Sequence, residues 1–211
     1  MAITKPFDEN IEQYENWFTE NKYAYKSELN AIKNLIPLGK KGIEVGIGSG
    51  LFAKPLNIKE GVEPSEKMRK LAKQRGLQVI DGIGENLPLP SEDYDFALMV
   101  TTICFLDDVL KSFGEINRIL KPGGSFIIGF VDKNSPLGKI YQKHKNENPF
   151  YRYATFYSTG KIINLLKKQG FSIGRITQTV FGNLSKINFV QKIKEGYGKG
   201  SFVCIEAKKE S

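Results

Sequence analysis

Histidine, tryptophan and cysteine are scarce in this chain, which has one histidine, one tryptophan and two cysteines among 211 residues. The two cysteines, Cys104 and Cys204, are far apart in the sequence, and no spacing typical of a zinc site accompanies them. These absences argue against a disulfide framework and leave no recognisable ligand set for a metal. We therefore expect a reduced, cytoplasmic protein whose chemistry needs no bound metal.

Long hydrophobic runs are absent as well. The longest, residues 126–131, is interrupted by Gly129 and is far too short to cross a bilayer. The first six residues lack the apolar core of a signal peptide. A content of 40% hydrophobic and 26% charged residues suits one globular domain with a sizeable core. We expect a single domain over residues 1–211 with no membrane insertion.

Positive charge exceeds negative charge, and the formal net charge is +8. A balance of this kind is compatible with an RNA partner. The lysines are dispersed, however, and most of them fall on expected polar helix faces or near a chain end, as do Lys208 and Lys209. This dispersal favours a solvated surface over a nucleic-acid interface.

Glycine recurs at every second position from Gly46 to Gly50, at the end of a segment that reads GIEVGIGSG. Glycine tolerates positive φ and lacks a Cβ, so that a ligand can lie against the backbone. The N-terminus of a helix that starts after such a loop would suit a carboxylate or a phosphate. A dinucleotide fingerprint requires glycine at the position that Leu51 occupies here. The segment is therefore either a ligand-binding loop of another kind or a plain turn.

An acidic residue follows the next expected strand, in residues 60–65, which read EGVEPS. Doubly wound sheets place such an acid at the carboxyl end of the second strand, where it binds both ribose hydroxyls. The alternative is that Glu63 is an acid favoured by the dipole of the helix that follows. The glycine loop upstream favours the ribose role.

Strand and helix patterns alternate through most of the chain and predict a parallel sheet with right-handed crossovers. Helices are expected over 8–35, after 51, over 65–75, after 107 or 108, and over 158–170, with caps at Ser65, Gly76 and Ser158. Strands are expected over 42–45, 61–63, 77–80, 94–100, 125–131, 171–181 and 202–207. A tight turn is expected at 121–124.

Four segments together resemble the class I S-adenosylmethionine (SAM) dependent methyltransferases, and most closely the small ubiquinone/menaquinone-type and related small-molecule methyltransferases. Residues 44–50 resemble the first motif of that family, and residues 62–68 resemble its ribose-binding segment. Residues 84–88 with 94–98 resemble the adenine loop and fourth strand, and residues 118–124 the turn before the fifth strand. The resemblance runs from about Tyr14 to the C-terminus.

The resemblance implies an α/β fold, doubly wound and Rossmann-like. Its sheet would have seven mostly parallel strands, with antiparallel strands at the C-terminus including the last. It also implies a helical cap over residues 1–38, a SAM-binding core over 39–131, a lid or acceptor segment over 132–157, and a C-terminal helix and strands over 158–211.

The resemblance further implies which residues contact SAM. The glycine loop would offer amide groups to the methionine carboxylate, Glu63 would bind the ribose, and backbone at Thr101 and Thr102 would pass near the sulfonium. The acid that often binds the adenine amino group is replaced by Ile83, so that Glu85, Asp81 or backbone groups would have to substitute. The expected cofactor contacts are Tyr14, Glu44, Gly46, Ile47, Gly48, Gly50, Glu63, Pro64, Ile83, Gly84, Glu85 and Thr101.

Methyl transfer by in-line displacement needs mainly positioning and exclusion of water, and a base is optional. His144 and Tyr14 are the candidates for a catalytic group, although a lone histidine in a polar segment is typical of a solvated surface. The tyrosines at 141, 151, 153 and 157 either line an acceptor pocket or pack a lid, and Trp17 either packs the lid or belongs to the core. Nothing in the sequence near Cys104 would activate it as a nucleophile.

Three functions remain open besides methyl transfer to a small-molecule acceptor. A nucleic-acid methyltransferase would fit the net charge, but the Asn/Asp-Pro-Pro-Tyr/Phe motif of base-amino methyltransferases is replaced by residues 100–103, VTTI. A SAM-binding module without catalytic activity is the second. An NAD-dependent dehydrogenase is the third, and Leu51 disfavours it. The sequence does not identify the acceptor atom.

Overall fold

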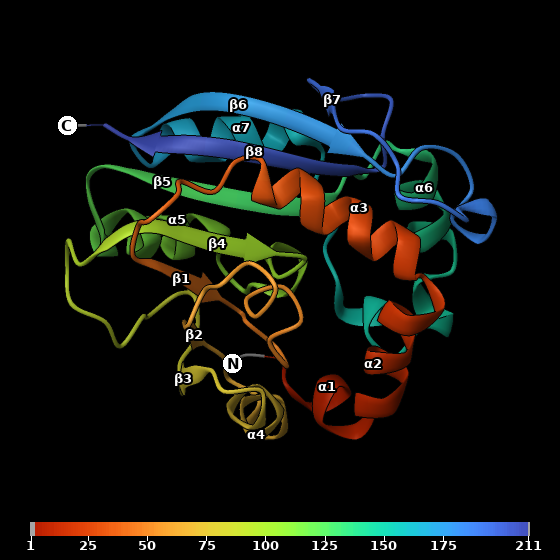
Figure 1. Cartoon of the computed structure of the whole chain (residues 1–211), viewed down its shortest axis with the longest axis horizontal. Coiled ribbons are helices and arrows are strands. Elements are labelled where there is room, and N and C mark those ends of the chain that lie inside the picture. Colours follow the sequence, from red (N-terminus) through yellow and green to blue (C-terminus); the bar gives the residue numbers. More distant parts are fainter. Residues whose placement is uncertain (1–2, 211) are drawn as a thin grey trace.

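A computed structural model describes residues 3–210 of the chain. Helices surround a central twisted sheet, as Figure 1 shows. The strands are β1 (Gly42–Val45), β2 (Glu60–Val62), β3 (Gln78–Ile80), β4 (Tyr94–Val100), β5 (Leu120–Val131), β6 (Phe171–Thr179), β7 (Lys194–Glu195) and β8 (Phe202–Lys209). The α-helices are α1 (Lys5–Glu9), α2 (Ile11–Glu20), α3 (Lys22–Lys33), α4 (Glu66–Gln74), α5 (Val109–Ile119), α6 (Pro136–Lys143) and α7 (Thr159–Lys168). Short 3₁₀ helices are η1 (Ile103–Phe105), η2 (Lys145–Glu147), η3 (Tyr151–Tyr153) and η4 (Leu184–Lys186).

The sheet has the strand order β3-β2-β1-β4-β5-β8-β6-β7. Neighbours from β3 to β5 are parallel, whereas β8 is antiparallel to both β5 and β6. The doubly wound fold and its antiparallel last strand are therefore confirmed. The strand count differs, because the two-residue strand β7 pairs with Thr177 and Gln178 at the edge of β6 and makes eight strands instead of seven.

Two hydrophobic clusters cover the two faces of the sheet. Helices α5 and α7 pack on one face, where Phe113, Ile162 and Phe126 are fully buried. Helix α3 and the segment after the glycine loop cover the other face, where Ile32 and Leu98 are fully buried. In Figure 1 these two layers lie behind and in front of the sheet. Burial on both faces explains why the central strands read as nearly continuous apolar runs.

Local signals placed most helix ends correctly. Ser65 accepts a hydrogen bond from the amide of Met68 at 3.1 Å, and Ser158 caps α7 in the same way. Asp108, one of the two expected caps, accepts from the amide of Lys111 and begins α5. Gly76 and Gly170 follow their helices with φ of +85° and +73°, the left-handed conformation that glycine adopts without strain.

Three expectations about elements were wrong in detail. The single helix over 8–35 is divided into α1, α2 and α3, because Asn10 and Asn21 end a helix by donating side-chain bonds to the carbonyls of Pro6 and Trp17. The helix after Leu51 is replaced by turns, since Pro55 lacks an amide donor. Strand β5 begins at Leu120 and includes the tight turn.

Helix α3 is the longest N-terminal helix and the one that packs on the sheet, against β5, β6 and β8. Its buried side chains are Ala24, Ser27, Glu28, Ala31 and Ile32. Helices α1 and α2 continue from it over the carboxyl ends of the parallel strands (Figure 1). Within residues 3–210 no helix is both long and apolar enough to cross a membrane.

Candidate active site

A cavity of about 350 Å³ lies at the carboxyl ends of the parallel strands. Val45, Val62 and Val100, the last residues of β1, β2 and β4, form part of its floor. Side chains from α1, α2 and α3 and from the segment 148–157 line its other walls. Ligands in open α/β sheets bind at this edge, so the topology alone marks the cavity as the candidate site.

The glycine loop after β1 has the backbone conformation that its sequence predicts. Gly46, Gly48 and Gly50 all have positive φ, between +55° and +85°. A Cβ on Gly46 would meet the side chain of Thr102 at 2.3 Å, and one on Gly48 would meet the Tyr14 hydroxyl at 3.0 Å. Gly46 and Gly48 line the cavity, where the absence of a Cβ lets a ligand approach their backbone closely. Gly50 packs against Leu77 outside the cavity.

Four amides of this loop donate hydrogen bonds within the chain, whereas the resemblance predicts that the loop offers amides to a carboxylate. Those of Gly46 and Ile47 both donate to the Val62 carbonyl, at 2.8 and 3.1 Å. The amide of Gly50 donates to the Ile47 carbonyl, and that of Gly48 to Glu63. The side chain of Ile47 is buried beneath the loop and does not line the cavity. The amides of Gly46, Ile47 and Gly48 thus hold the loop against β2 and the acid that follows it, and the loop contributes shape to the cavity.

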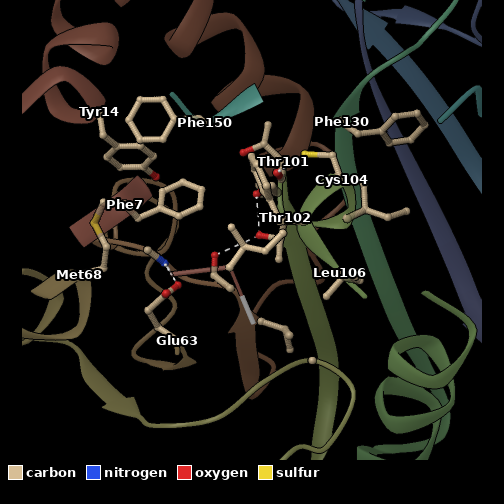
Figure 2. Close-up of a pocket in the computed structure, with 18 of the residues that line it drawn as sticks. Phe7, Tyr14, Glu63, Met68, Thr101, Thr102, Cys104, Leu106, Phe130 and Phe150 are labelled. Carbon is tan, nitrogen blue, oxygen red and sulfur yellow. Dashed lines mark hydrogen bonds between the residues drawn. The ribbon is translucent and has the colours of Figure 1, made fainter. Parts of the chain in front are cut away.

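Glu63, the acid after β2, lies in the cavity wall and is 8% exposed. Its two carboxylate oxygens accept hydrogen bonds from the amides of Gly48 and Ser65, both at 2.9 Å. Burial raises the pKa of Glu63, while these amides and Arg69 oppose the rise. Figure 2 shows the carboxylate directed toward the loop. The acid is both a helix-start residue and a wall of the site, so the two interpretations of Glu63 are compatible.

Glu44 lies in β1 and does not line the cavity. It is 1% exposed, and one of its carboxylate oxygens has no partner among the described residues. Burial raises its pKa well above the ordinary value, opposed by a hydrogen bond from the Ala53 amide. The Tyr14 hydroxyl lies in its field, and burial together with the nearby carboxylates of Glu63 and Glu44 raises the pKa of Tyr14. Tyr14 is therefore a neutral phenol at ordinary pH.

Strand β4 ends in a strained turn that enters the cavity. Thr101 has φ of +51°, which is costly for a β-branched residue. The Thr102 hydroxyl lies 3.1 Å from the Gly46 carbonyl and 3.0 Å from that of Val100. These contacts join the end of β4 to the glycine loop (Figure 2). Strain held at this point is typical of functional sites.

The expected adenine side contains Pro64, Met68, Ile83 and Gly84, all of which line the cavity. Glu85 also lines it, and one of its oxygens accepts from the amides of Asp107 and Asp108 at 2.9 and 3.2 Å. Asp81, the other suggested substitute for an adenine-binding acid, is mostly exposed and pairs with Arg69 at 2.7 Å instead. Of the two acids, only Glu85 is placed to face a bound ligand.

Helix α2 is fastened to the core by one ionic cluster. Glu15 pairs with Arg75 and accepts a hydrogen bond from the Ser49 hydroxyl. Arg75 in turn donates to the Ser49 carbonyl at 2.6 Å. This cluster holds Tyr14 and Trp17 at the cavity. No sequence motif marked Glu15, Arg75 or Ser49 as partners.

An aromatic cluster closes the cavity over the glycine loop. Phe7 and Phe150 stack at 5.3 Å between ring centroids, and Tyr14 contacts both rings (Figure 2). Tyr141 and Tyr151 lie 4.5 Å apart in the acceptor segment and line the cavity with Tyr157. Of the four expected lid tyrosines, Tyr153 alone is outside the cavity lining, at 50% exposed.

His144 and Cys104 are both unsuited to catalysis as placed. His144 ends α6 at the surface, where it lies 3.0 Å from Glu147 and outside the cavity lining. Cys104 lines the cavity, but its thiol donates to the Thr101 carbonyl at 3.1 Å and burial raises its pKa to about 12. The thiol therefore stays protonated and is no nucleophile.

Glu28 on α3 also lines the cavity. It was not among the site residues expected from the sequence. It is 3% exposed, and burial raises its pKa to about 8. A signal was present: Ala24, Glu28 and Ile32 recur at helical spacing, so the acid occupies an apolar stripe. A buried position of this kind is unusual for an unpaired acid.

The charge of the cavity lining is opposite to that of the whole chain. Its described residues include the four acids Glu28, Glu63, Glu85 and Asp107 but no lysine, arginine or histidine. No group of three or more histidine, cysteine or acidic side chains within residues 3–210 is arranged to hold a metal ion. The rest of the lining is mostly apolar and aromatic, with a few uncharged polar side chains, which suits a flat apolar base and a sulfonium cation.

Residues 43–128 match the family model described as a methyltransferase domain. An uncharacterized protein of Methanocaldococcus jannaschii, MJ1123, is 46% identical over 203 residues, which cover 96% of this chain and 98% of that protein. These matches include the glycine loop, Glu63 and the strained turn after β4. They extend the family resemblance well beyond single motifs.

Solved structures that resemble this chain also point to the methyltransferase family. The crystal structure of a SAM-dependent methyltransferase of Thermotoga maritima, described as a possible histamine N-methyltransferase, has a TM-score of 0.95 and 46% identity and covers 98% of this chain and 99% of its own. A magnesium protoporphyrin IX methyltransferase of Synechocystis with bound S-adenosylhomocysteine (SAH) has a TM-score of 0.71, covers 98% of both chains and, at 15% identity, shares the fold alone. The chain belongs to the class I SAM-dependent methyltransferases, and its cofactor is SAM.

Proposed function

We propose that this enzyme methylates a small-molecule acceptor that binds beside the cofactor in the same cavity. The observation that carries the proposal is the enclosure of that cavity by α1, α2, α3 and the aromatic residues of segment 148–157. Several separate parts of the chain line the cavity, an arrangement that favours an acceptor small enough to enter it over a polymer. The expected cofactor contacts that line the cavity remain part of this proposal: Tyr14, Gly46, Gly48, Glu63, Pro64, Ile83, Gly84, Glu85 and Thr101. Glu44, Ile47 and Gly50 lie outside the lining and are not proposed as direct contacts.

The residues of the chain would position the cofactor and the acceptor and would exclude water from the cavity. SAM supplies an activated methyl group on its sulfonium. Glu63 would accept hydrogen bonds from the ribose, and Pro64 and Ile83 would pack on the adenine. Phe7, Tyr14 and Phe150 would exclude water, which strengthens the electrostatic interactions within the cavity. A dedicated base is not part of the proposal.

Transfer to nucleic acid is less well supported. A phosphate backbone is bound by lysine and arginine side chains, and the described cavity lining has neither. The net charge of +8 resides elsewhere on the molecule. A SAM-binding module without catalysis is also less well supported, because the acceptor half of the cavity is open to occupation. We further propose a cytoplasmic location and the division into cap (1–38), core (39–131), acceptor segment (132–157) and C-terminal part (158–211).

The deciding experiment uses SAM labelled on its methyl group, incubated with the protein and a fractionated cell extract. We expect label in the small-molecule fraction, and less of it with Glu63→Ala at limiting SAM. Label in RNA would replace this proposal with nucleic-acid methylation. Absence of transfer, with SAM binding intact by calorimetry, would favour the non-catalytic module. Because the Thermotoga relative is described as a possible histamine N-methyltransferase, histamine is one pure compound to test.

A further inference from the structure

Glu28 is a buried acid without a partner in the wall of the cavity. Its side chain comes from the sheet-facing side of α3, between Ala24 and Ile32. Among residues 3–210 no hydrogen-bond donor or basic side chain pairs with its carboxyl group, which nevertheless is part of the cavity lining. Burial of an ionisable group is costly unless a partner compensates for the lost water. A bound ligand is the partner that this position lacks.

Aromatic rings lie around Glu28 on the same side of the cavity. Tyr141, Tyr151 and Trp17 line the cavity with it, and the two tyrosines lie in its electrostatic field. The tyrosine rings are 4.5 Å apart, and Tyr141 also interacts through its hydroxyl with Tyr151 and with Trp17. Aromatic faces attract cations, most strongly where water is excluded. A carboxyl group beside such rings is a combination that recognises a positively charged nitrogen.

This group of residues is separate from the cofactor contacts. Glu63 follows β2, whereas α3 packs on β5, β6 and β8, and in the sheet β1 and β4 lie between these two regions. Figure 2 shows Glu63 and Phe130, near the end of β5, on opposite sides of Thr101 and Thr102. By the strand order, β4 and the strained turn at its end therefore lie between Glu63 and the strands on which α3 packs.

We propose that Glu28, with the rings of Trp17, Tyr141 and Tyr151, binds the positively charged nitrogen of a small organic amine, which is the methyl acceptor. This proposal rests on the proposed function and names its substrate class. The cation need not be the atom that is methylated, because the same contact would orient any part of the acceptor. Glu28 accordingly determines which acceptor binds in the cavity, whereas Glu63 binds the cofactor.

Binding can be measured without turnover on the full chain saturated with SAH, just above pH 8, where Glu28, with its pKa of about 8, is largely ionised and the amine probe is still protonated. The probes are 2-phenylethylamine and benzyltrimethylammonium, with 2-phenylethanol as the neutral counterpart of the first. We expect both cations to bind more tightly than the alcohol, and Glu28→Gln to weaken them by about 10- to 100-fold, the range for a lost hydrogen-bonded charge. Glu28→Asp should recover part of the affinity. Glu20→Gln, which removes an exposed acid at the end of α2, is the matched control.

Equal binding of the amine and the alcohol by the wild-type complex would overturn the proposal, as would cation binding that Glu28→Gln leaves unchanged. Preference of both wild type and variant for the alcohol would also overturn it, and would indicate that Glu28 donates a proton to a neutral acceptor oxygen. SAM affinity should be the same in Glu28→Gln and wild type. A loss there would make Glu28 a cofactor residue and would contradict the proposal as well.

The labelled extract separates the two proposals. Its small molecules are first divided on a cation exchanger at pH 7. Label in retained compounds supports both the proposed function and the role of Glu28. Label only in unretained small molecules would keep the proposed function and overturn the amine specificity. Label only in RNA would overturn both.

Discussion

The Glu63 carboxylate accepts a hydrogen bond of 2.9 Å from the amide of Gly48, which joins the acid after β2 to the glycine loop after β1. Its second oxygen accepts from Ser65, the cap of α4. The same carboxylate therefore positions the loop and the helix start that surround the cofactor. A ribose bound to Glu63 must share these oxygens with two amides, which ties cofactor binding to the shape of the loop.

Replacing Glu63 should weaken SAM binding. For Glu63→Ala we expect a cost of about 1–3 kcal/mol, from the loss of charge-assisted hydrogen bonds. Calorimetric titration of the folded variant with SAM measures the cost. Glu66→Ala is the matched control, because Glu66 follows closely in the sequence on exposed helix surface and pairs with Lys70. Equal affinities of wild type and Glu63→Ala would leave Glu63 with its helix-start role alone.

Substitution of Gly48 should abolish SAM binding. Gly48 has φ of +55°, and a Cβ there would lie 3.0 Å from the Tyr14 hydroxyl. In Gly48→Val the branched side chain would add strain and occupy the space over the loop. Gly76→Ala controls for strain alone, because Gly76 also has positive φ but nothing within 4 Å of a Cβ. SAM binding by a folded Gly48→Val at wild-type affinity, measured by calorimetry, would refute the role of the loop.

The cluster that fastens α2 should control how firmly the cavity is closed. Glu15→Gln removes the partly buried ion pair with Arg75. We expect this change to destabilise α2 locally by about 1 kcal/mol. Hydrogen exchange of residues 11–20 should become faster, and the SAM affinity should fall a few-fold. Glu9→Gln breaks the exposed pair with Lys5 and should change neither quantity. Faster exchange throughout the sheet in Glu15→Gln would instead mean that the pair supports the whole fold.

Glu28 should make stability depend on pH. Burial raises its pKa from 4.5 to about 8, so the folded chain holds a proton that the unfolded chain releases near pH 4.5. The associated stability is present below pH 4.5 and is lost as the pH rises toward 8 and above. Glu28→Gln removes this loss, and relative to wild type it should gain stability over that range, up to roughly 5 kcal/mol at full ionisation.

Urea unfolding of wild type and Glu28→Gln, followed from mildly acidic to mildly alkaline pH, measures this difference in the free energy of unfolding. The difference isolates Glu28 because Glu44 and Glu63, whose pKa values burial also raises, titrate in both proteins. The groups that face Glu28 are Tyr25, Tyr141, Tyr151 and Cys204, and burial raises the pKa of each, which keeps all four neutral over most of the range. A difference that does not change with pH would mean that Glu28 is already paired.

Much of the cofactor half of the site was predictable, because the motifs that mark it involve residues only a few positions apart in the sequence. Ser65 caps α4 through a bond to a residue three positions on, and Gly76 ends that helix by its own φ. Glu63 and the glycine loop meet because the first two strands of a doubly wound sheet are neighbours and end at one edge. Local chemistry and a known topology suffice for contacts of this kind.

The remaining contacts of the site were not predictable, because they join residues from distant segments. The cluster of Glu15, Arg75 and Ser49 joins three parts of the chain, and nothing local in any of them identifies the other two. The amide directions of the glycine loop likewise depended on Val62, in a neighbouring strand. Whether a tyrosine of segment 132–157 faces the cavity or solvent depended on packing, which placed Tyr151 in the cavity lining and left Tyr153 exposed.

A parallel sheet, the helix caps, the glycine loop and the acid after β2 follow from the sequence alone, because periodicity, capping and backbone conformation act over a few residues. The surface position of His144 and the place of Glu28 in the cavity wall follow instead from the packing of distant segments. The physical reason is burial: the environment of a side chain is set by whatever segment packs over it. For Glu28 that environment combines α3 with the rings of Tyr141 and Tyr151, more than a hundred residues away in the chain.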